Sequence, residues 1–304
     1  MEVEPGKTGL EIMAKRKVET RAPVRIDLSG GWTDVPVYTH DQGGDVVNFS
    51  INLYARASLL VDDDGKLSVS YSADVPLGSG FGTTGALNVA LLAAIKGAGL
   101  TTDEVAEKAF QFEKLLDNTG GRQDQWAAAY GGFQRLIFIG DTVERMPLEP
   151  LPSAKSWLKR QLLVVNSGIE HVSGDLHDEF WQRYQDGDAD VVAGLQKLRS
   201  TTKLVMDGLQ SDRRDLMVES FRMTCDALDL MAPHVHAPFK PVVDPLLANK
   251  DIAAWKAIGA GGGGCAALLC GHQRREVVEA AVIEAGWTIV EWDYDDEGLT
   301  VEES

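Results

Sequence analysis

Basic residues are scarce in this chain of 304 residues. Lys and Arg number 29 against 46 Asp and Glu, so the formal net charge is −17 at pH 7. A general nucleic-acid or anionic-membrane binder needs a basic surface, and this balance argues against both kinds of partner. A local anion site stays compatible with it. Salt screens surface charge beyond roughly 8–10 Å at physiological ionic strength, so a few arginines can decide such a site.

Cysteine is also scarce, and long apolar runs are missing. The three cysteines, Cys225, Cys265 and Cys270, are odd in number and form no Cys-x-x-Cys pair. They therefore fit neither a disulfide framework nor a zinc site. No run reaches the roughly 18 apolar residues of a membrane span, and residues 1–17 lack the apolar centre of a signal peptide. We expect a cytoplasmic protein whose 44% hydrophobic residues build a sizeable core.

A lysine is missing where it would define a P-loop. The turn over residues 76–85 is rich in glycine, but no Lys-Ser or Lys-Thr follows its last glycine. Residues 80–85 do match Gly-x-Gly-x-x-Gly. A dinucleotide fingerprint must lie in a parallel βαβ unit, however, and the preceding strand is expected to belong to an antiparallel hairpin. Two interpretations remain, namely main-chain N–H groups that bind phosphate and a simple helix N-cap.

A second glycine run covers residues 259–264 and follows Lys256 closely. An apolar stretch begins at Cys265, directly after the run, so a flexible linker is a poor interpretation. Glycine costs about 0.5–1 kcal/mol against alanine inside a regular element, so two such clusters indicate that the backbone approaches something closely.

The pattern of elements predicts an α+β fold. Apolar residues alternate with polar ones from Val47 to Val61, which indicates a long strand with one buried face. Strands come first in the chain, then mixed elements, then the long amphipathic stretches 189–209 and 213–231, and finally strand, helix and strand. We predict two domains, residues 1–155 and 156–304. The acidic end of the chain, from Glu291 on, is expected to be a solvated, frayed tail.

Polar residues gather at the end of the strand predicted over residues 24–28. Arg25 and Asp27 share one face of that strand. Trp32 and Asp34 follow on a loop after two glycines, and an aromatic ring beside a carboxylate suits sugar binding. In isolation, a core Trp beside a turn Asp is the more common arrangement.

Asp124 lies in the segment Gly-Gly-Arg-Gln-Asp-Gln over residues 120–125. A carboxylate next to a cation has its charged form favoured and can accept a proton from a hydroxyl. A capping Asp with solvated neighbours is the alternative. Glu113, eleven residues earlier near the end of a predicted helix, is by itself best interpreted as a surface acid.

These four segments, in their order along the chain, resemble the GHMP kinases (galactokinase, homoserine, mevalonate and phosphomevalonate kinases). The resemblance runs from about Arg21 to Trp292. Residues 120–125 with Tyr130-Gly131-Gly132-Phe133 look most like bacterial heptose 7-phosphate kinases, and residues 25–34 look more like fucokinases. The implied fold joins an N-terminal domain resembling ribosomal protein S5 domain 2 to a ferredoxin-like C-terminal domain.

The resemblance also implies cofactors and site residues. ATP and Mg²⁺ would be the cofactors, Asp124 the catalytic base with Arg25 beside it, and Thr84 with Glu113 the metal ligands. The residues that would hold ATP are Pro76, Gly78, Ser79, Gly80, Phe81, Gly82, Thr83 and Thr84. Those that would contact the substrate are Asp27, Gly30, Gly31, Trp32, Asp34, Gly121, Arg122, Gln123, Gly261, Gly262 and His171.

The function implied is transfer of the γ-phosphoryl group of ATP to the anomeric hydroxyl of a heptose 7-phosphate or fucose-like sugar. A small-molecule sugar or sugar phosphate would be the partner, and a homodimer is compatible with the sequence. The chain departs from the family pattern at Thr83-Thr84, where two serines are usual, and at Ile258, where Ser or Thr is usual. A sensor of sugar or nucleotide without turnover is the first alternative, and a dinucleotide-dependent oxidoreductase is the second.

Overall fold

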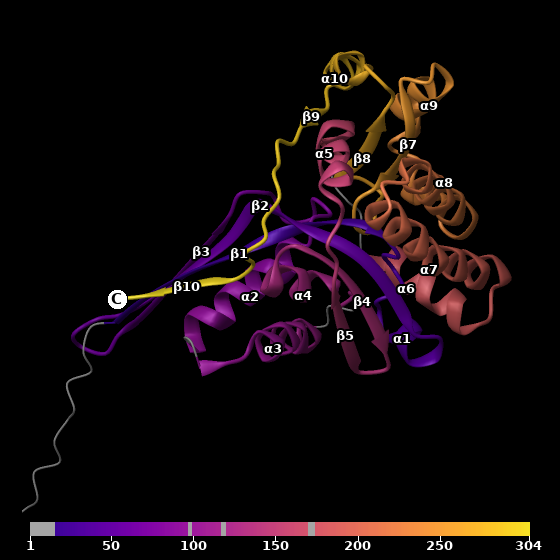
Figure 1. Cartoon of the computed structure of the whole chain (residues 1–304). Helices are drawn as coiled ribbons and strands as arrows, with labels where there is room; N and C mark the ends of the chain where they lie inside the picture. The colour runs from indigo at the N-terminus through magenta and orange to yellow at the C-terminus, as the bar shows by residue number, and fades with distance from the viewer. Residues whose placement is uncertain (1–15, 97–98, 117–119, 170–173) are drawn as a thin grey trace, which may run out of the picture.

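Two antiparallel sheets organise the chain (Figure 1). A computed structural model describes residues 16–96, 99–116, 120–169 and 174–304. The first sheet has the strand order β10-β1-β2-β4-β5, with β3 paired to β2. Its strands are β1 (Arg16–Ser29), β2 (Gly44–Val61), β3 (Leu67–Ala73), β4 (Phe133–Ile139), β5 (Thr142–Pro147) and β10 (Thr300–Glu303).

The second sheet has the strand order β7-β8-β6-β9. Its strands are β6 (Leu162–Asn166), β7 (Ile252–Ala257), β8 (Cys265–Cys270) and β9 (Thr288–Ile289). Helices lie between β6 and β7 and between β8 and β9, so the chain order is βαββαβ. This confirms the ferredoxin-like arrangement predicted for the C-terminal half, and the whole chain is α+β as expected.

Helices cover the two sheets in separate groups. Against the first sheet pack α2 (Thr83–Lys96) and α4 (Gln123–Tyr130), and α3 (Thr102–Leu115) packs on these two helices. The rest are α1 (Pro36–Asp41), α5 (Pro152–Gln161), α6 (Gly174–Gln185), α7 (Ala189–Gln210), α8 (Arg214–Met231), α9 (Lys240–Ala248), α10 (Arg275–Glu284) and a 3₁₀ turn (Pro233–Val235). Within the described ranges, no helix combines the length and the apolarity that crossing a membrane requires.

The described residues form two apolar clusters, and one of them joins the two halves of the chain. Val205 of α7 and Phe221 of α8 belong to the same buried cluster as Ile26 of β1 and Val47 of β2. Contacts of α7 with both β1 and β2 agree with this. Because burial of apolar surface stabilises packing at roughly 25 cal/mol per Å², this shared cluster holds the two sheets together and fixes what lies between them.

The prediction of a frayed acidic tail was wrong. Strand β10 pairs with β1, with Val18 opposite Glu303, and Asp295 is buried and accepts a hydrogen bond from Tyr54. Apolar residues such as Trp292 are interleaved with the acids and pack into the core. The chain therefore ends in the first sheet, and Figure 1 shows its C-terminus beside β1.

Candidate active site

The two glycine turns lie against each other. A Cβ atom added to Gly80 would come within 2.1 Å of the Ile258 carbonyl oxygen, and one on Gly259 within 2.7 Å of the Gly80 carbonyl oxygen. The N–H of Cys265 donates to the carbonyl of Ser79 at 3.1 Å. Glycine is needed here because two backbones touch, one from each half of the chain.

Asp124 lies directly beside the first of these turns. A Cβ atom on Gly82 would be 2.6 Å from the Asp124 carboxyl carbon, and one on Gly85 would be 2.6 Å from its Cβ. Both distances are too short for any side chain, so the turn and the start of α2 wrap closely around Asp124. Asp124 sits in the first turn of α4, where a helix favours a negative charge.

Arg25 connects Asp124 to the glycine turn. Its Nη2 lies 2.5 Å from Asp124 Oδ1, and its Nη1 donates to the Gly80 carbonyl at 2.5 Å. The Arg25 side chain is 5% exposed, against 25% for Asp124. The buried guanidinium therefore holds the Asp124 carboxylate in position, and the carboxylate is the member of the pair that remains accessible to solvent.

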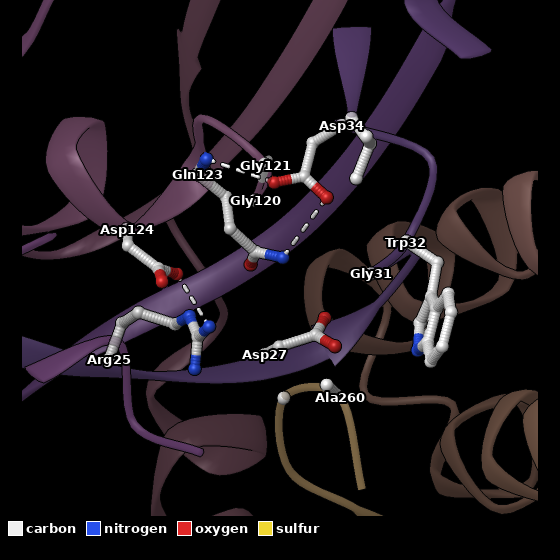
Figure 2. Close-up of a pocket in the computed structure, with 12 residues that line it drawn as sticks. Arg25, Asp27, Gly31, Trp32, Asp34, Gly120, Gly121, Gln123, Asp124 and Ala260 are labelled. Carbon is white, nitrogen blue, oxygen red and sulfur yellow. Dashed lines mark hydrogen bonds and ion pairs between the residues drawn. The ribbon is translucent and has the colours of Figure 1, made fainter. Parts of the chain in front are cut away.

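A pocket of about 150 Å³ opens beside this pair (Figure 2). It is smaller than the roughly 300–1,000 Å³ typical of sites for drug-sized ligands, so it suits a small molecule. Loops from both halves of the chain contribute to it. The lining residues are Arg25, Asp27, Gly31, Trp32, Asp34, Val35, Gly120, Gly121, Gln123, Asp124, Gly259 and Ala260.

Asp34 is held by the amide groups of Gln123. The Gln123 backbone N–H donates to Oδ2 at 3.0 Å, and its side-chain amide donates to Oδ1 at 3.5 Å. Burial raises the pKa of Asp34 to about 6, and the negative charges of Asp124 and Asp27 act in the same direction. The backbone hydrogen bond opposes this rise without cancelling it. Asp34 is thus a buried hydrogen-bond acceptor, and additional hydrogen-bond donors would stabilise its ionised form.

Asp27 pairs with a residue that sequence reasoning missed. Nζ of Lys256 donates to Asp27 Oδ2 and to the Asp27 carbonyl, both at 2.7 Å. Both side chains are almost fully buried, and burial lowers the pKa of Lys256 while Asp27 opposes that change. A single Lys in the otherwise apolar strand β7 was the available signal, because a buried Lys needs a partner.

Glu113 is buried, contrary to the surface acid that its isolated position suggested. Its Oε1 accepts hydrogen bonds from Asn88 and Gln125, both at 2.9 Å. Thr84 is exposed at the start of α2, one helical turn before Asn88. Glu113 is therefore hydrogen-bonded to the same helix that carries Thr84.

Trp32 reaches the pocket through an uncommon backbone conformation. Its φ is 77°, a value that non-glycine residues rarely adopt. The ring is half-buried and meets the edge of Phe180 from α6, with 4.6 Å between ring centroids. Figure 2 shows the indole at the side of the pocket opposite Asp124. Strained residues of this kind gather at functional sites.

Several predicted substrate residues lie outside the pocket lining. Arg122 is buried, donates to the backbone and carboxylate of Asp141 and lies over the ring of Phe110. Gly30 packs on the Asp45 carbonyl. Gly261 packs on Val235, and the N–H of Gly262 donates to the carbonyl of that residue. His171 lies outside the described residues. Sequence order alone did not show which way Arg122 points.

The context of the first glycine turn disfavours a dinucleotide site. Strand β3, which precedes the turn, pairs antiparallel with β2. The parallel βαβ unit that gives Gly-x-Gly-x-x-Gly its meaning is therefore not formed here.

Comparison with known proteins agrees with this geometry. Residues 48–132 match the family model of the GHMP kinases N terminal domain. A bifunctional fucokinase/GDP-fucose pyrophosphorylase of Arabidopsis thaliana is 23% identical, covering 85% of this chain and 30% of its own length. A D-glycero-alpha-D-manno-heptose 7-phosphate kinase of Campylobacter jejuni is 27% identical, covering 48% of this chain and 57% of its own length. The chain therefore spans less than two thirds of either relative.

Solved structures share the fold over nearly the whole chain. A D-glycero-D-manno-heptose 1-phosphate kinase from Bacteriodes thetaiotaomicron has a TM-score of 0.75 at 20% identity, covering 94% of this chain and 98% of its own. A Lactococcus lactis galactokinase complexed with galactose has a TM-score of 0.69 at 14% identity, covering 95% of both chains. At such identities the likeness concerns the fold.

Proposed function

We propose that this chain, whose residues 48–132 match the GHMP kinases N terminal domain, is a sugar kinase that transfers the γ-phosphoryl group of ATP to a sugar hydroxyl, in the first place the anomeric one. The observation that carries this proposal is the position of Asp124. It lies between a glycine turn suited to phosphates and a small polar pocket suited to a sugar. A proton acceptor between donor and acceptor sites is what phosphoryl transfer to a hydroxyl requires.

The residues of the first turn fit a nucleotide triphosphate and a divalent ion. The first N–H groups of α2 have no partner within the helix, and together with the helix dipole they favour an anion. Thr84 and Glu113 would hold Mg²⁺. Among the residues described, no group of three or more His, Cys, Asp or Glu could hold a metal, and Mg²⁺ is usually completed by phosphate oxygens and water.

Bound MgATP would supply an activated phosphoryl group whose charge is partly neutralised by the metal. The protein's own residues would do the rest. Asp124 accepts the proton of the sugar hydroxyl at its carboxylate. Arg25 fixes that carboxylate and ties it to the Gly80 carbonyl, so the base and the turn keep one geometry. Asp34 and Asp27 accept hydrogen bonds from the sugar hydroxyls, and the Trp32 ring packs against the sugar.

The test is the release of ADP from MgATP over a panel of sugars, with the new phosphate located by NMR. We expect turnover with at least one sugar. Asp124→Asn should lower kcat by at least about 10²-fold, the low end for loss of a general base, while sugar and MgATP still bind. A kcat near the wild-type value in that variant would remove Asp124 from the role of base.

A sensor without turnover is the alternative to be separated. It predicts that sugar and MgATP bind, by calorimetry, and that no sugar produces ADP above the background of Asp124→Asn. Asp215→Asn is the matched control, because Asp215 is an exposed member of a surface ion pair on α8. This variant should keep the wild-type rate.

A further inference from the structure

The pocket carries more negative than positive side chains, and this bears on what kind of sugar it accepts. We propose that it selects an uncharged sugar and disfavours one that already carries a phosphate. This inference rests on the proposed kinase function and narrows its substrate class.

Three carboxylates, those of Asp27, Asp34 and Asp124, line the pocket together with one cation, Arg25. Figure 2 shows all four side chains around the same space. Arg25 forms its ion pair with Asp124 and donates a hydrogen bond to the Gly80 carbonyl. Its charge is therefore already matched inside the protein, on the side of the glycine turn.

The buried Lys256 behind the pocket is matched in the same way. Its Nζ contacts the side chain and the carbonyl of Asp27. Arg122, the other cation on the segment that supplies Gln123 and Asp124, binds Asp141 instead. With Asp27 and Asp124 each paired, Asp34 remains, and in the described part of the chain it forms no ion pair. When the buried Lys256 is counted with the described lining, one net negative charge therefore remains.

Among the described residues that line the pocket, unmet hydrogen-bonding capacity remains on a carboxylate oxygen of Asp27 and on the buried Nε of Arg25. Oδ1 of Asp27 is buried and, within the described chain, accepts no hydrogen bond. A buried acceptor without a hydrogen bond is unfavourable, so a ligand hydroxyl that donates to it is favoured. Asp34 likewise gains from donors, because within the described residues its hydrogen-bond donors are the amide groups of Gln123. Sugar hydroxyls are such donors, whereas a phosphate brings acceptors and negative charge.

Two charges of like sign that lie close together in a partly buried site repel each other. We therefore expect kcat/KM for a neutral sugar to exceed that of the same sugar bearing a distal phosphate by at least about tenfold. The expected ratio is modest because salt screens the part of the phosphate charge that stays exposed to solvent. The experiment measures ADP release and calorimetric binding for matched pairs. The pairs are mannose and mannose 6-phosphate, galactose and galactose 6-phosphate, and D-glycero-D-manno-heptose and its 7-phosphate.

Charge variants then test the cause. Asp34→Asn removes the unpaired charge, so the preference for the neutral member should fall by about tenfold, whatever the loss of overall rate. Asp215→Asn makes the same chemical change on the exposed surface and should leave the preference unchanged. Thermal unfolding confirms that both variants are folded.

The outcomes separate the two claims. Faster turnover or tighter binding of the phosphate member in every pair overturns this inference and leaves the kinase intact. Binding of the neutral sugars without any ADP overturns the kinase function and leaves the selectivity of the pocket standing. A preference for neutral sugars that Asp34→Asn does not reduce would show that the charge balance is not its cause.

Discussion

At the scale of single residues, Asp34 couples the site to pH. Its pKa is raised from 3.8 to about 6 by burial and by neighbouring carboxylates. Between those two values the folded protein holds a proton that the unfolded chain has lost. The free energy of unfolding therefore falls as pH rises from about 4 to about 6. The contribution is about 3 kcal/mol, at about 1.4 kcal/mol for each pH unit.

Urea unfolding at pH 4, 5, 6 and 7 checks this prediction against Asp34→Asn. The Asn variant cannot ionise, so it should gain about 3 kcal/mol relative to wild type between pH 4 and pH 7. A constant difference between the two proteins across this range would mean that Asp34 titrates normally. A saturating neutral sugar should flatten the wild-type curve, because hydroxyl donors favour the ionised carboxylate.

Single residues also show where sequence reasoning is sufficient. The alternation of a strand predicted correctly that Arg25 and Asp27 share one face, and the resemblance to the GHMP kinases implied that Asp124 lies beside Arg25. The ion-pair partners of Lys256 and Arg122 could not be predicted from the sequence, for one physical reason. Their partners, Asp27 and Asp141, are distant in sequence, and only the packing of the two sheets shows which charge meets which.

At the scale of elements, the contact between the glycine turns is the feature that a mutation can probe. Gly80 and Gly78 both have positive φ, 91° and 76°. A Cβ atom on Gly80 meets the Ile258 carbonyl, whereas one on Gly78 meets nothing within 4 Å. Both alanine variants bear the left-handed strain of about 1–2 kcal/mol, and only Gly80→Ala must also separate the turns.

We therefore expect Gly80→Ala to unfold at a clearly lower temperature than Gly78→Ala and to lose more kcat/KM, since the turn contacts both Arg25 and Asp124. Differential scanning calorimetry and ADP release on the pair give the two numbers. Equal behaviour of both variants would indicate that the turns move apart without cost.

Element boundaries were predictable where one periodicity dominated. The long strand expected over residues 47–61 is β2, and the stretches 189–209 and 213–231 are α7 and α8. Helix α9 was not foreseen, because Pro245 lies inside it, and α5 spans the predicted domain boundary near residue 155. Strand β10 was missed because its acids were counted as a charged tail. Its partners, including Arg16, which forms an ion pair with Glu303, come from the other end of the chain.

At the scale of the whole molecule, the site exists only where the two sheets meet. Asp27 belongs to β1 of the first sheet, and Lys256 belongs to β7 of the second. Their ion pair is buried on both sides, and the pocket takes Gly259 and Ala260 from the second half of the chain. Stability and the geometry of the site are therefore linked through this contact.

A double-mutant cycle measures that link. Lys256→Met leaves Asp27 as an unpaired buried charge, so we expect a loss of about 3–5 kcal/mol in the free energy of unfolding. Lys256→Met with Asp27→Asn removes both charges and should lose less than the two single variants together, by about 0.5–3 kcal/mol. Lys203→Met is the matched control, because Lys203 pairs with Asp207 on the surface at 79% exposure, and it should change little. Additive losses would mean that the two side chains act independently, so that the sheets are joined by the apolar core alone.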